Sequence, residues 1–455
     1  MADTHTPVRW QSRRAFILAV TGAAVGLGNI WRFPYITGEN GGSAFLLQYV
    51  AFIVLLGLPV MMAEIMIGRT GRAGPLAALT QLARDNGRSR QWSKLAVFGG
   101  LTLFLILSFY AVVSGWSLAY LGKSINGDFV GLAAADVGAQ FNGFLQDLPL
   151  MLGCHLAFLL MTMLVVARGV SAGLEKLNNL LMPLLYLLLL LLAGFAATTP
   201  GFGEALHWLF WPNPEALSWQ ATLDAMGHAF FTLAVGACAL MAYGAYMPEE
   251  QSLPRAAVAV AVLDVVVALL AGIAIFAVVF SHGMEPAGGP GLMFVTLPVA
   301  FAEVPGGSLW LSAFFVLLVL ATWTSSINLA EPLVAMLVDK QWPRPLAAAV
   351  VGGCVWMLGV LAALSFSLLS DWHPLGFIAV FDGKTLFDLL TSIPPDLFLP
   401  LGGLFIAWFA ARGLTTEQIE TALGSAFMAR LWRVVVMWVS IPMLLAVLLI
   451  TLYRW

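Results

Sequence analysis

The residues best suited to chemistry in this sequence are polar ones that interrupt long apolar runs. The first run carries Gly22, Gly26, Asn29 and Arg32 near its middle. Two glycines spaced by four residues can simply allow two helices to pack closely. A guanidinium deep in a bilayer, however, costs at least about 3 kcal/mol unless it faces a partner or a watery cavity. The four residues together therefore favour a polar site over helix packing alone.

A second interruption lies half a chain later, where Gly236 follows the string FFTLAV at residues 230–235. Paired glycine-interrupted segments in corresponding halves of a chain are typical of inverted-repeat proteins whose unwound backbone lines a site at the membrane midplane. We therefore interpret the two interruptions as two sides of one site.

Polar groups also occur in later runs. Ala321, Thr324 and Ser325 are spaced so that they share one helical face. Hydroxyls in membrane helices most often bond back to their own backbone, yet this set could equally offer hard oxygen ligands to a small cation. For the carboxylates Glu64 and Glu331 we favour a structural role, in which they satisfy backbone groups freed at a broken helix.

The composition indicates the environment in which these polar groups lie. Of the 455 residues, 60% are hydrophobic and only 10% are charged, whereas soluble proteins carry about a quarter charged residues. This excludes a soluble enzyme, a nucleic-acid binder and a disordered chain. The 3 cysteines stand alone and the histidines form no HExxH or triad-like set, so we expect no enzyme active site.

Hydropathy and charge together predict the topology. A spanning helix needs about 20 mostly apolar residues, and the sequence divides into eleven such runs. With a cytoplasmic N-terminus, 17 of the 21 basic residues fall on the inner side, which predicts that the C-terminus lies outside. The expected location is the inner (plasma) membrane of the cell. The runs are residues 14–36, 43–68, 95–121, 148–167, 174–197, 223–246, 256–280, 309–339, 346–369, 387–411 and 431–453.

The expected organisation follows from these runs and their connections. It comprises a cytoplasmic N-terminal segment at residues 1–13, a first repeat at 14–197, an extracellular connection at 198–222, a second repeat at 223–411, and a cytoplasmic connection with the last span at 412–455.

Five strings make a family resemblance specific. The chain resembles the neurotransmitter:sodium symporter family, in particular its bacterial amino-acid transporters, and the agreement extends over the first ten predicted spans. The resemblance implies an all-α polytopic membrane protein with 11 transmembrane helices and a 5+5 inverted repeat whose helices 1 and 6 are broken. It also implies a sodium-coupled symporter that imports an amino acid by alternating access. The strings are GLGNIWRFP at 26–34, ENGG at 39–42, GHAFFTL at 227–233, FVTLP at 294–298 and TSS at 324–326.

The resemblance further implies which residues bind the substrate and two sodium ions. The substrate-binding residues would be Ala24, Leu27, Gly28, Ile106, Tyr110, Phe231, Thr232, Ala234, Ala237, Ser325 and Leu329. One sodium would be held by the carbonyls of Gly22, Val25 and Ala321 and the hydroxyls of Thr324 and Ser325. The other would be held by the Ala24 carbonyl, Asn29, Thr232, Asp264 and the substrate carboxylate.

Gates are implied in the same way. Arg32 and Asp388 resemble the outer gate pair, while Tyr246 and Asp339 match inner gate positions. The usual inner arginine is displaced here to Arg9, so either Arg9 reaches Asp339 from another register or this gate is looser. Gly173 and Pro183 match a motif at which helix 5 unwinds.

Two departures from the family pattern bear on mechanism. Asp264 stands where many relatives have Asn, and a fixed negative charge beside the sodium would replace a chloride ion, so chloride is not expected. The same carboxylate could return protonated on the empty carrier, which would give proton antiport. Ala237 falls where a bulky residue is common, which favours a larger hydrophobic or aromatic amino acid.

The expected partners are therefore an amino acid, sodium ions and the lipid bilayer, with no nucleic acid and an unknown oligomeric state. The alternative function is a passive channel or a non-transporting amino-acid receptor on the same scaffold.

Overall fold

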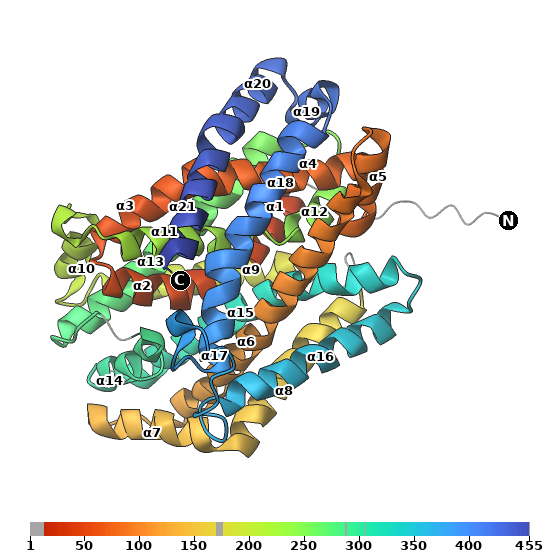
Figure 1. Cartoon of the computed structure of the whole chain (residues 1–455). Coiled ribbons are helices and arrows are strands. Elements are labelled where there is room, and N and C mark those ends of the chain that lie inside the picture. Colours follow the sequence, from red (N-terminus) through yellow and green to blue (C-terminus); the bar gives the residue numbers. More distant parts are fainter. Residues whose placement is uncertain (1–12, 170–175, 287–288, 305, 455) are drawn as a thin grey trace.

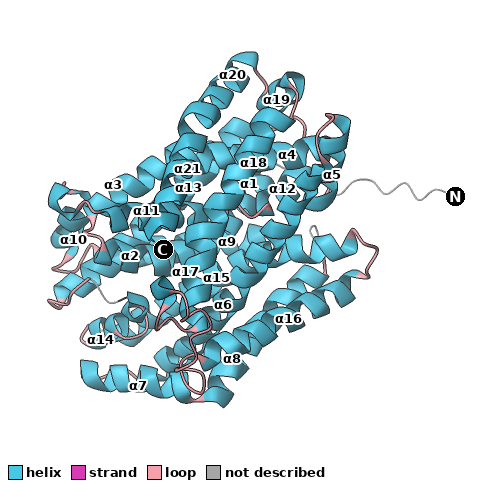
Figure 2. Ribbon diagram, viewed as in Figure 1, coloured by secondary structure: helices cyan, strands magenta, loops and turns pink. Residues whose placement is uncertain are grey.

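The structure is a computed structural model that describes residues 13–169, 176–286, 289–304 and 306–454. These residues form helices joined by short connections and contain no strand (Figure 2). The helices of the first half are α1 (Arg13–Ala24), α2 (Phe33–Glu39), α3 (Ser43–Phe52), α4 (Leu58–Gly71), α5 (Pro75–Asp85), α6 (Ser93–Asn126), α7 (Ala134–Gln146), α8 (Leu148–Ala167), α9 (Lys176–Ala196) and α10 (Phe202–Phe210). Those of the second half are α11 (Trp219–Thr232), α12 (Ala239–Ala245), α13 (Leu253–Ser281), α14 (Thr296–Ala302), α15 (Gly307–Val338), α16 (Arg344–Leu364), α17 (Leu386–Ile393), α18 (Leu399–Gly413), α19 (Thr416–Leu423), α20 (Ala426–Val435) and α21 (Ile441–Arg454).

Most of these helices have the length and composition of membrane spans. In the described part of the chain, 9 helices are long and apolar enough to cross a bilayer, and the bent pair Phe16–Ala24 and Gly28–Glu39 makes up to 10. The predicted sixth span is divided into α11, of 14 residues, and α12, of 7 residues, each too short to cross alone. The count of eleven therefore stays a prediction, and the all-helical multi-pass architecture is confirmed.

Two long helices, α6 and α15, run side by side through the centre of the molecule (Figure 1). Helices α8 and α16 pack on this pair, and α9 and α13 pack on each other beside α1. The half-helix α12 packs against α4, and α11 packs against α3. One continuous cluster of buried apolar side chains extends through these contacts, and both breaks lie in the buried interior.

The first break lies between Ala24 and Gly28, where the two helical pieces meet at 45°. Gly26 is required there by packing: a Cβ at this position would lie 2.6 Å from the Ser325 Cβ and 2.6 Å from the Tyr110 hydroxyl. Only glycine lets the chain approach α6 and α15 this closely. The helix then resumes as a π-helical turn at Gly28–Arg32, a distortion that is frequent at functional sites.

The second break lies between Thr232 and Ala239. Gly236 has a φ of +97°, and a Cβ on it would lie 2.1 Å from the carbonyl oxygen of Leu399. Ala234 and Cys238 also have positive φ values, 52° and 60°, which is costly for residues with a side chain.

A buried carboxylate from α4 satisfies this freed backbone. Glu64 accepts hydrogen bonds from the amides of Gly236 and Leu240, so its predicted structural role is confirmed. Glu331 is different, because it pairs with the guanidinium of Arg344 rather than with backbone amides. The prediction for Glu331 is therefore wrong, because the start of α16 places the Arg344 guanidinium against its carboxylate.

Candidate functional site

The two breaks and the two central helices enclose a small cavity. In this conformation its volume is about 20 Å³, enough for about one water molecule. Almost all of the implied substrate-binding residues line it, although they come from four different parts of the chain. The lining consists of Ala23, Ala24, Gly28, Leu103, Ile106, Tyr110, Phe231, Ala234, Ala237, Ser325, Leu329 and Leu399.

Two implied substrate residues, Leu27 and Thr232, lie outside this lining but bond to groups around it. The amide of Leu27 donates to the Tyr110 hydroxyl over 3.0 Å, and the Gly26 amide donates to the Asn29 Oδ1 atom over 3.0 Å. These amides begin a helical segment, where the backbone dipole favours an anion. The arrangement can therefore bind a carboxylate between the Leu27 and Gly28 amides and the Tyr110 hydroxyl.

A buried carboxylate lies next to this amide end. Asp264 Oδ1 accepts from the Asn29 amide over 2.7 Å, and the Thr232 hydroxyl lies 3.0 Å from both Asp264 oxygens. The Tyr49 hydroxyl completes the set, donating to Oδ2 over 3.2 Å. Asp264 is 0% exposed, and within the described ranges it contacts no cationic side chain.

A fully buried carboxylate with only neutral donors is expensive, because hydrogen bonds offset its desolvation only in part. A small cation bound to the oxygens of Asp264, Asn29 and Thr232 would compensate the charge with the hard ligands that such ions prefer. The implied second sodium site is thus brought together from three helices. Tyr49 was missed by the sequence analysis, because an isolated tyrosine in an apolar span resembles ordinary core.

The residues implied for the first sodium ion lie where α1 crosses α15. The Thr324 hydroxyl bonds back to the carbonyls of Leu320 and Ala321, as hydroxyls in membrane helices commonly do. The Ser325 hydroxyl instead crosses to the Ala23 carbonyl over 3.2 Å. The crossing therefore places carbonyl and hydroxyl oxygens of both helices close together.

Asn178 of α9 is a second residue that the sequence analysis missed. It is 1% exposed, both polar atoms of its side-chain amide lack a hydrogen-bond partner among the described residues, and its Oδ1 would lie 3.1 Å from a Cβ on Gly22. An unpartnered amide is costly in an apolar interior. The sequence offered one indication of its importance: Asn178 lies between Gly173 and Pro183, the two residues of the implied helix-unwinding motif.

The outer gate prediction requires a correction. Arg32 forms its ion pair with Asp396 over 2.7 Å, not with Asp388. The Asp388 carboxylate instead accepts from the amide and hydroxyl of Thr385 and caps the start of α17. The chain then forms a π-helical turn at Pro394–Phe398, which directs Asp396 toward Arg32. The guanidinium also lies 5.1 Å from the centre of the Phe231 ring, so the pair and this ring close the cavity together.

The inner gate residues are only partly described. Arg9 and Gly173 lie outside the described residues, and Pro183 lies within α9. Asp339 follows α15, and its carboxylate would lie 2.6 Å from a Cβ on Gly74. Tyr246 ends α12, and no hydrogen bond joins it to Asp339 in the part of the chain that the structure describes.

Two broken helices that face each other across a buried polar site define a secondary transporter with discontinuous helices. A model of the sodium:neurotransmitter symporter family matches residues 8–142 and 136–455. The chain belongs to the sodium:neurotransmitter symporter family. It is therefore a multi-pass membrane transporter that uses sodium, not an enzyme.

Individual relatives agree along nearly the whole chain. The uncharacterized sodium-dependent transporter YhdH of Bacillus subtilis is 36% identical over 414 residues, covering 91% of this chain and 89% of that protein. The sodium-dependent serotonin transporter of Drosophila melanogaster is 26% identical over 502 residues, covering 98% of this chain and 77% of that protein. The crystal structure of MhsT in complex with L-phenylalanine superimposes with a TM-score of 0.89 and 40% identity, covering 97% of this chain and 99% of that chain.

Proposed function

We propose that this protein is a symporter that imports an amino acid together with sodium by alternating access. The observation that carries the proposal is the buried Asp264 carboxylate, which has only neutral donors among the described residues and is joined through Asn29 to the broken-helix segment that carries the Leu27 and Gly28 amides. A cation at Asp264 and a carboxylate at the amides would be oppositely charged neighbours, so each would strengthen the binding of the other. This mutual strengthening is the thermodynamic basis of coupling.

Two sodium sites are part of the proposal. One uses the carbonyls of Gly22, Val25 and Ala321 with Thr324 and Ser325, and supports the crossing of α1 and α15. The other uses the Ala24 carbonyl with Asn29, Thr232 and Asp264, and includes the substrate carboxylate. Because the second site contains the substrate, we expect substrate affinity to depend directly on sodium concentration.

The proposed substrate is a hydrophobic or aromatic amino acid. Apart from Tyr110 and Ser325, the side chains around the cavity are apolar or absent, and small residues at Ala234 and Ala237 leave room beside the Phe231 ring. MhsT, which shares this fold, was crystallised with L-phenylalanine. The 20 Å³ cavity must widen to admit such a molecule, since amino-acid-sized pockets need some hundreds of Å³. Movement of Phe231 and separation of Arg32 from Asp396 would provide that space.

We propose that the protein lies in the inner (plasma) membrane of the cell, with its N-terminus in the cytoplasm. Arg32 and Asp396 separate to admit substrate and sodium from outside, and their closure precedes opening on the inner side. Asp264 supplies the negative charge that would otherwise require chloride, so the transport is proposed to be independent of chloride.

The test uses the purified full-length chain in proteoliposomes. We expect uptake of a labelled amino acid only with an inward sodium gradient, and loss of that uptake in Asn29→Ala and Thr324→Ala. Thr322→Ala is a matched control, because the Thr322 hydroxyl only bonds back to Val319. Uptake without a gradient would instead indicate a passive channel, and binding without uptake would indicate a receptor.

Competition by unlabelled amino acids, with and without sodium, identifies the substrate in the same preparation. Inhibition by hydrophobic and aromatic amino acids, and only in sodium, is the expected result. Equal inhibition by acidic or basic amino acids would contradict the proposed pocket.

A further inference from the structure

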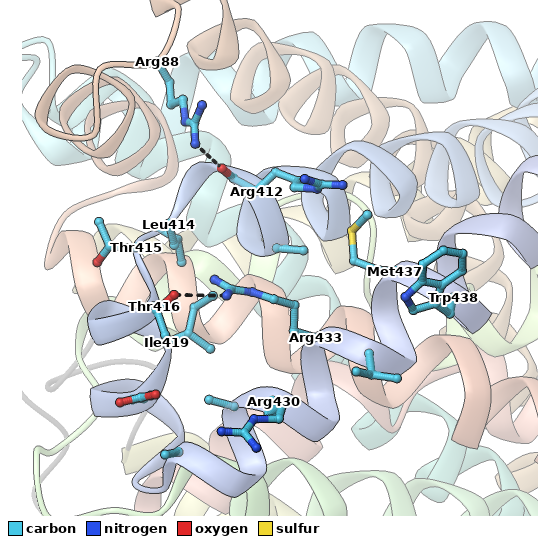
Figure 3. A pocket seen from close by; sticks show the side chains of 15 residues that line it. Arg88, Arg412, Leu414, Thr415, Thr416, Ile419, Arg430, Arg433, Met437 and Trp438 are labelled. Carbon is cyan, nitrogen blue, oxygen red and sulfur yellow. Dashed lines mark hydrogen bonds between the residues drawn. The ribbon is translucent and has the colours of Figure 1, made fainter.

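A second and much larger pocket lies away from the transport site, where α18, α19 and α20 converge. Its volume is about 710 Å³. Arg88 enters it from the segment after α5, Arg412 from the end of α18, and Arg430 and Arg433 from α20 (Figure 3). All four arginines belong to the basic residues that fall on the predicted inner side, and the proposed transport mechanism uses none of them.

The charge in this pocket is largely uncompensated. Glu420 is its only acidic lining residue among those described. Within the described ranges, none of the four arginines forms an ion pair with a carboxylate. Arg88 bonds to the Arg412 carbonyl over 2.6 Å, and Arg433 bonds to the Thr416 hydroxyl over 3.1 Å.

Arg433 shows the imbalance most directly. Its Nε atom is buried and has no hydrogen-bond partner in the described part of the chain. A buried guanidinium nitrogen without an acceptor is unfavourable, and phosphate oxygens match the planar fork of arginine well. The pocket therefore suits an anion that carries several oxygen acceptors.

The surroundings of the pocket are apolar and face outward. Trp438 is 78% exposed and Val434 is 50% exposed, and both line the pocket. On the other helix, the Arg412 guanidinium lies 6.0 Å from the Trp408 ring. Tryptophan is enriched where lipid headgroups meet acyl chains, so this edge has the character of a membrane interface.

An apolar groove continues from the same helix. Leu401, Phe405, Trp408 and Arg412 share one face of α18, because they are spaced by four, three and four residues. Leu401 and Phe405 line a groove of about 460 Å³, whose other side is formed by apolar Trp92, Leu95 and Phe98 and by polar Ser89, Gln91 and Lys94. The stripe thus places Leu401 and Phe405 of the groove and Arg412 of the basic pocket on one face of α18.

We propose that the basic pocket binds the phosphate headgroup of an anionic phospholipid, and that one acyl chain lies in the groove beside Phe405. The arginines alone would accept any phosphate. The outward-facing tryptophans and the adjoining groove are useful only to a ligand that also has a long apolar chain. A lipid satisfies both halves of the surface, and an inorganic ion satisfies one.

The experiment measures lipid retention by native mass spectrometry on the full-length chain, released from nanodiscs that contain equal amounts of phosphatidylglycerol and phosphatidylcholine. We expect selective retention of phosphatidylglycerol. Each arginine near a membrane surface contributes about a fivefold preference for an anionic lipid, so the double variant Arg430→Gln and Arg433→Gln should reduce the ratio by about 25-fold. The matched control is the double variant Arg84→Gln and Lys340→Gln, which removes the same charge from exposed positions on the predicted inner side.

Two further arms separate a lipid from a free ion. Phe405→Ala removes an exposed ring of the groove and should weaken phosphatidylglycerol retention while leaving all arginines in place. Inorganic phosphate at millimolar concentration should not displace the lipid. Unchanged retention in the arginine double variant, an equal loss in the control variant, or full displacement by inorganic phosphate would each overturn the proposal. Retention of phosphatidylcholine at the same level as phosphatidylglycerol would do so as well.

Discussion

Replacing Asp264 by Asn tests the proposed charge pairing at the second sodium site with almost no change in shape. The carboxylate bonds to Asn29 over 2.7 Å and to Thr232 over 3.0 Å, so a cation shared by these groups would lie within about 4 Å of it. At that distance the attraction is about 4 kcal/mol for an effective dielectric constant of 20. Because the amide dipole of Asn recovers part of this energy, we expect sodium affinity to fall by about 10²-fold.

The assay is uptake into proteoliposomes as a function of sodium, at a fixed substrate concentration, with gluconate or chloride as the anion. Asp264→Asn should need far more sodium in gluconate, and chloride should recover part of the loss by restoring a negative charge near the ion. Tyr49→Phe is the matched control: it removes one hydrogen bond to the carboxylate but keeps the charge, so it should not create a chloride effect. If Asp264→Asn kept the unmodified sodium dependence in gluconate, the carboxylate would not be a sodium ligand. A chloride requirement in the unmodified protein would contradict the same reasoning.

Three other perturbations address the gate, the pocket and the first break. Asp396→Asn leaves Arg32 buried without its partner, which costs about 3–5 kcal/mol in the closed form, so uptake should fall at least tenfold. Asp388→Asn should lower the thermal unfolding midpoint slightly through loss of a helix cap but leave uptake intact. The reverse pattern would restore Asp388 as the gate partner of Arg32. Ala237→Phe should shift the preference between tryptophan and alanine by about 10- to 200-fold in competition assays, and an unchanged preference would remove Ala237 from the pocket. Gly26→Ala places a methyl group 2.6 Å from the Tyr110 hydroxyl, which should destabilise the protein by about 1–3 kcal/mol. A scintillation proximity binding assay should show a loss of substrate affinity. Wild-type affinity would show that the break tolerates a side chain.

The site could be predicted to a large extent because its residues are expensive in a membrane. A lone polar residue such as Asn29 or Asp264 in an apolar span is costly and is therefore a functional candidate by default, and Gly26 and Gly236 mark the two breaks. The family resemblance then assigned roles to these positions, and the structure brings most of the implied substrate residues around one cavity.

The errors and omissions have a common physical cause. Asp388 and Asp396 are both acidic residues in one amphipathic stretch, and nothing in the linear order says which one caps α17 and which one follows the turn toward Arg32. Glu331 was assigned to freed backbone because its partner Arg344 belongs to the next helix. Asn178 was passed over because its significance depends on the Gly22 surface opposite it.

The sequence by itself determined the membrane class, the helical architecture and the positions of the two breaks, and its family resemblance implied most of the residues that line the cavity. It could do so because burial in lipid penalises polar groups and glycine interruptions, so each one that persists carries information. Only the tertiary structure decided which carboxylate faces Arg32, that Tyr49 completes the bonds to Asp264, and that four arginines from separate segments share one pocket. These are contacts between distant segments, and the energy of a charged group depends on the partners that folding brings within a few ångströms of it.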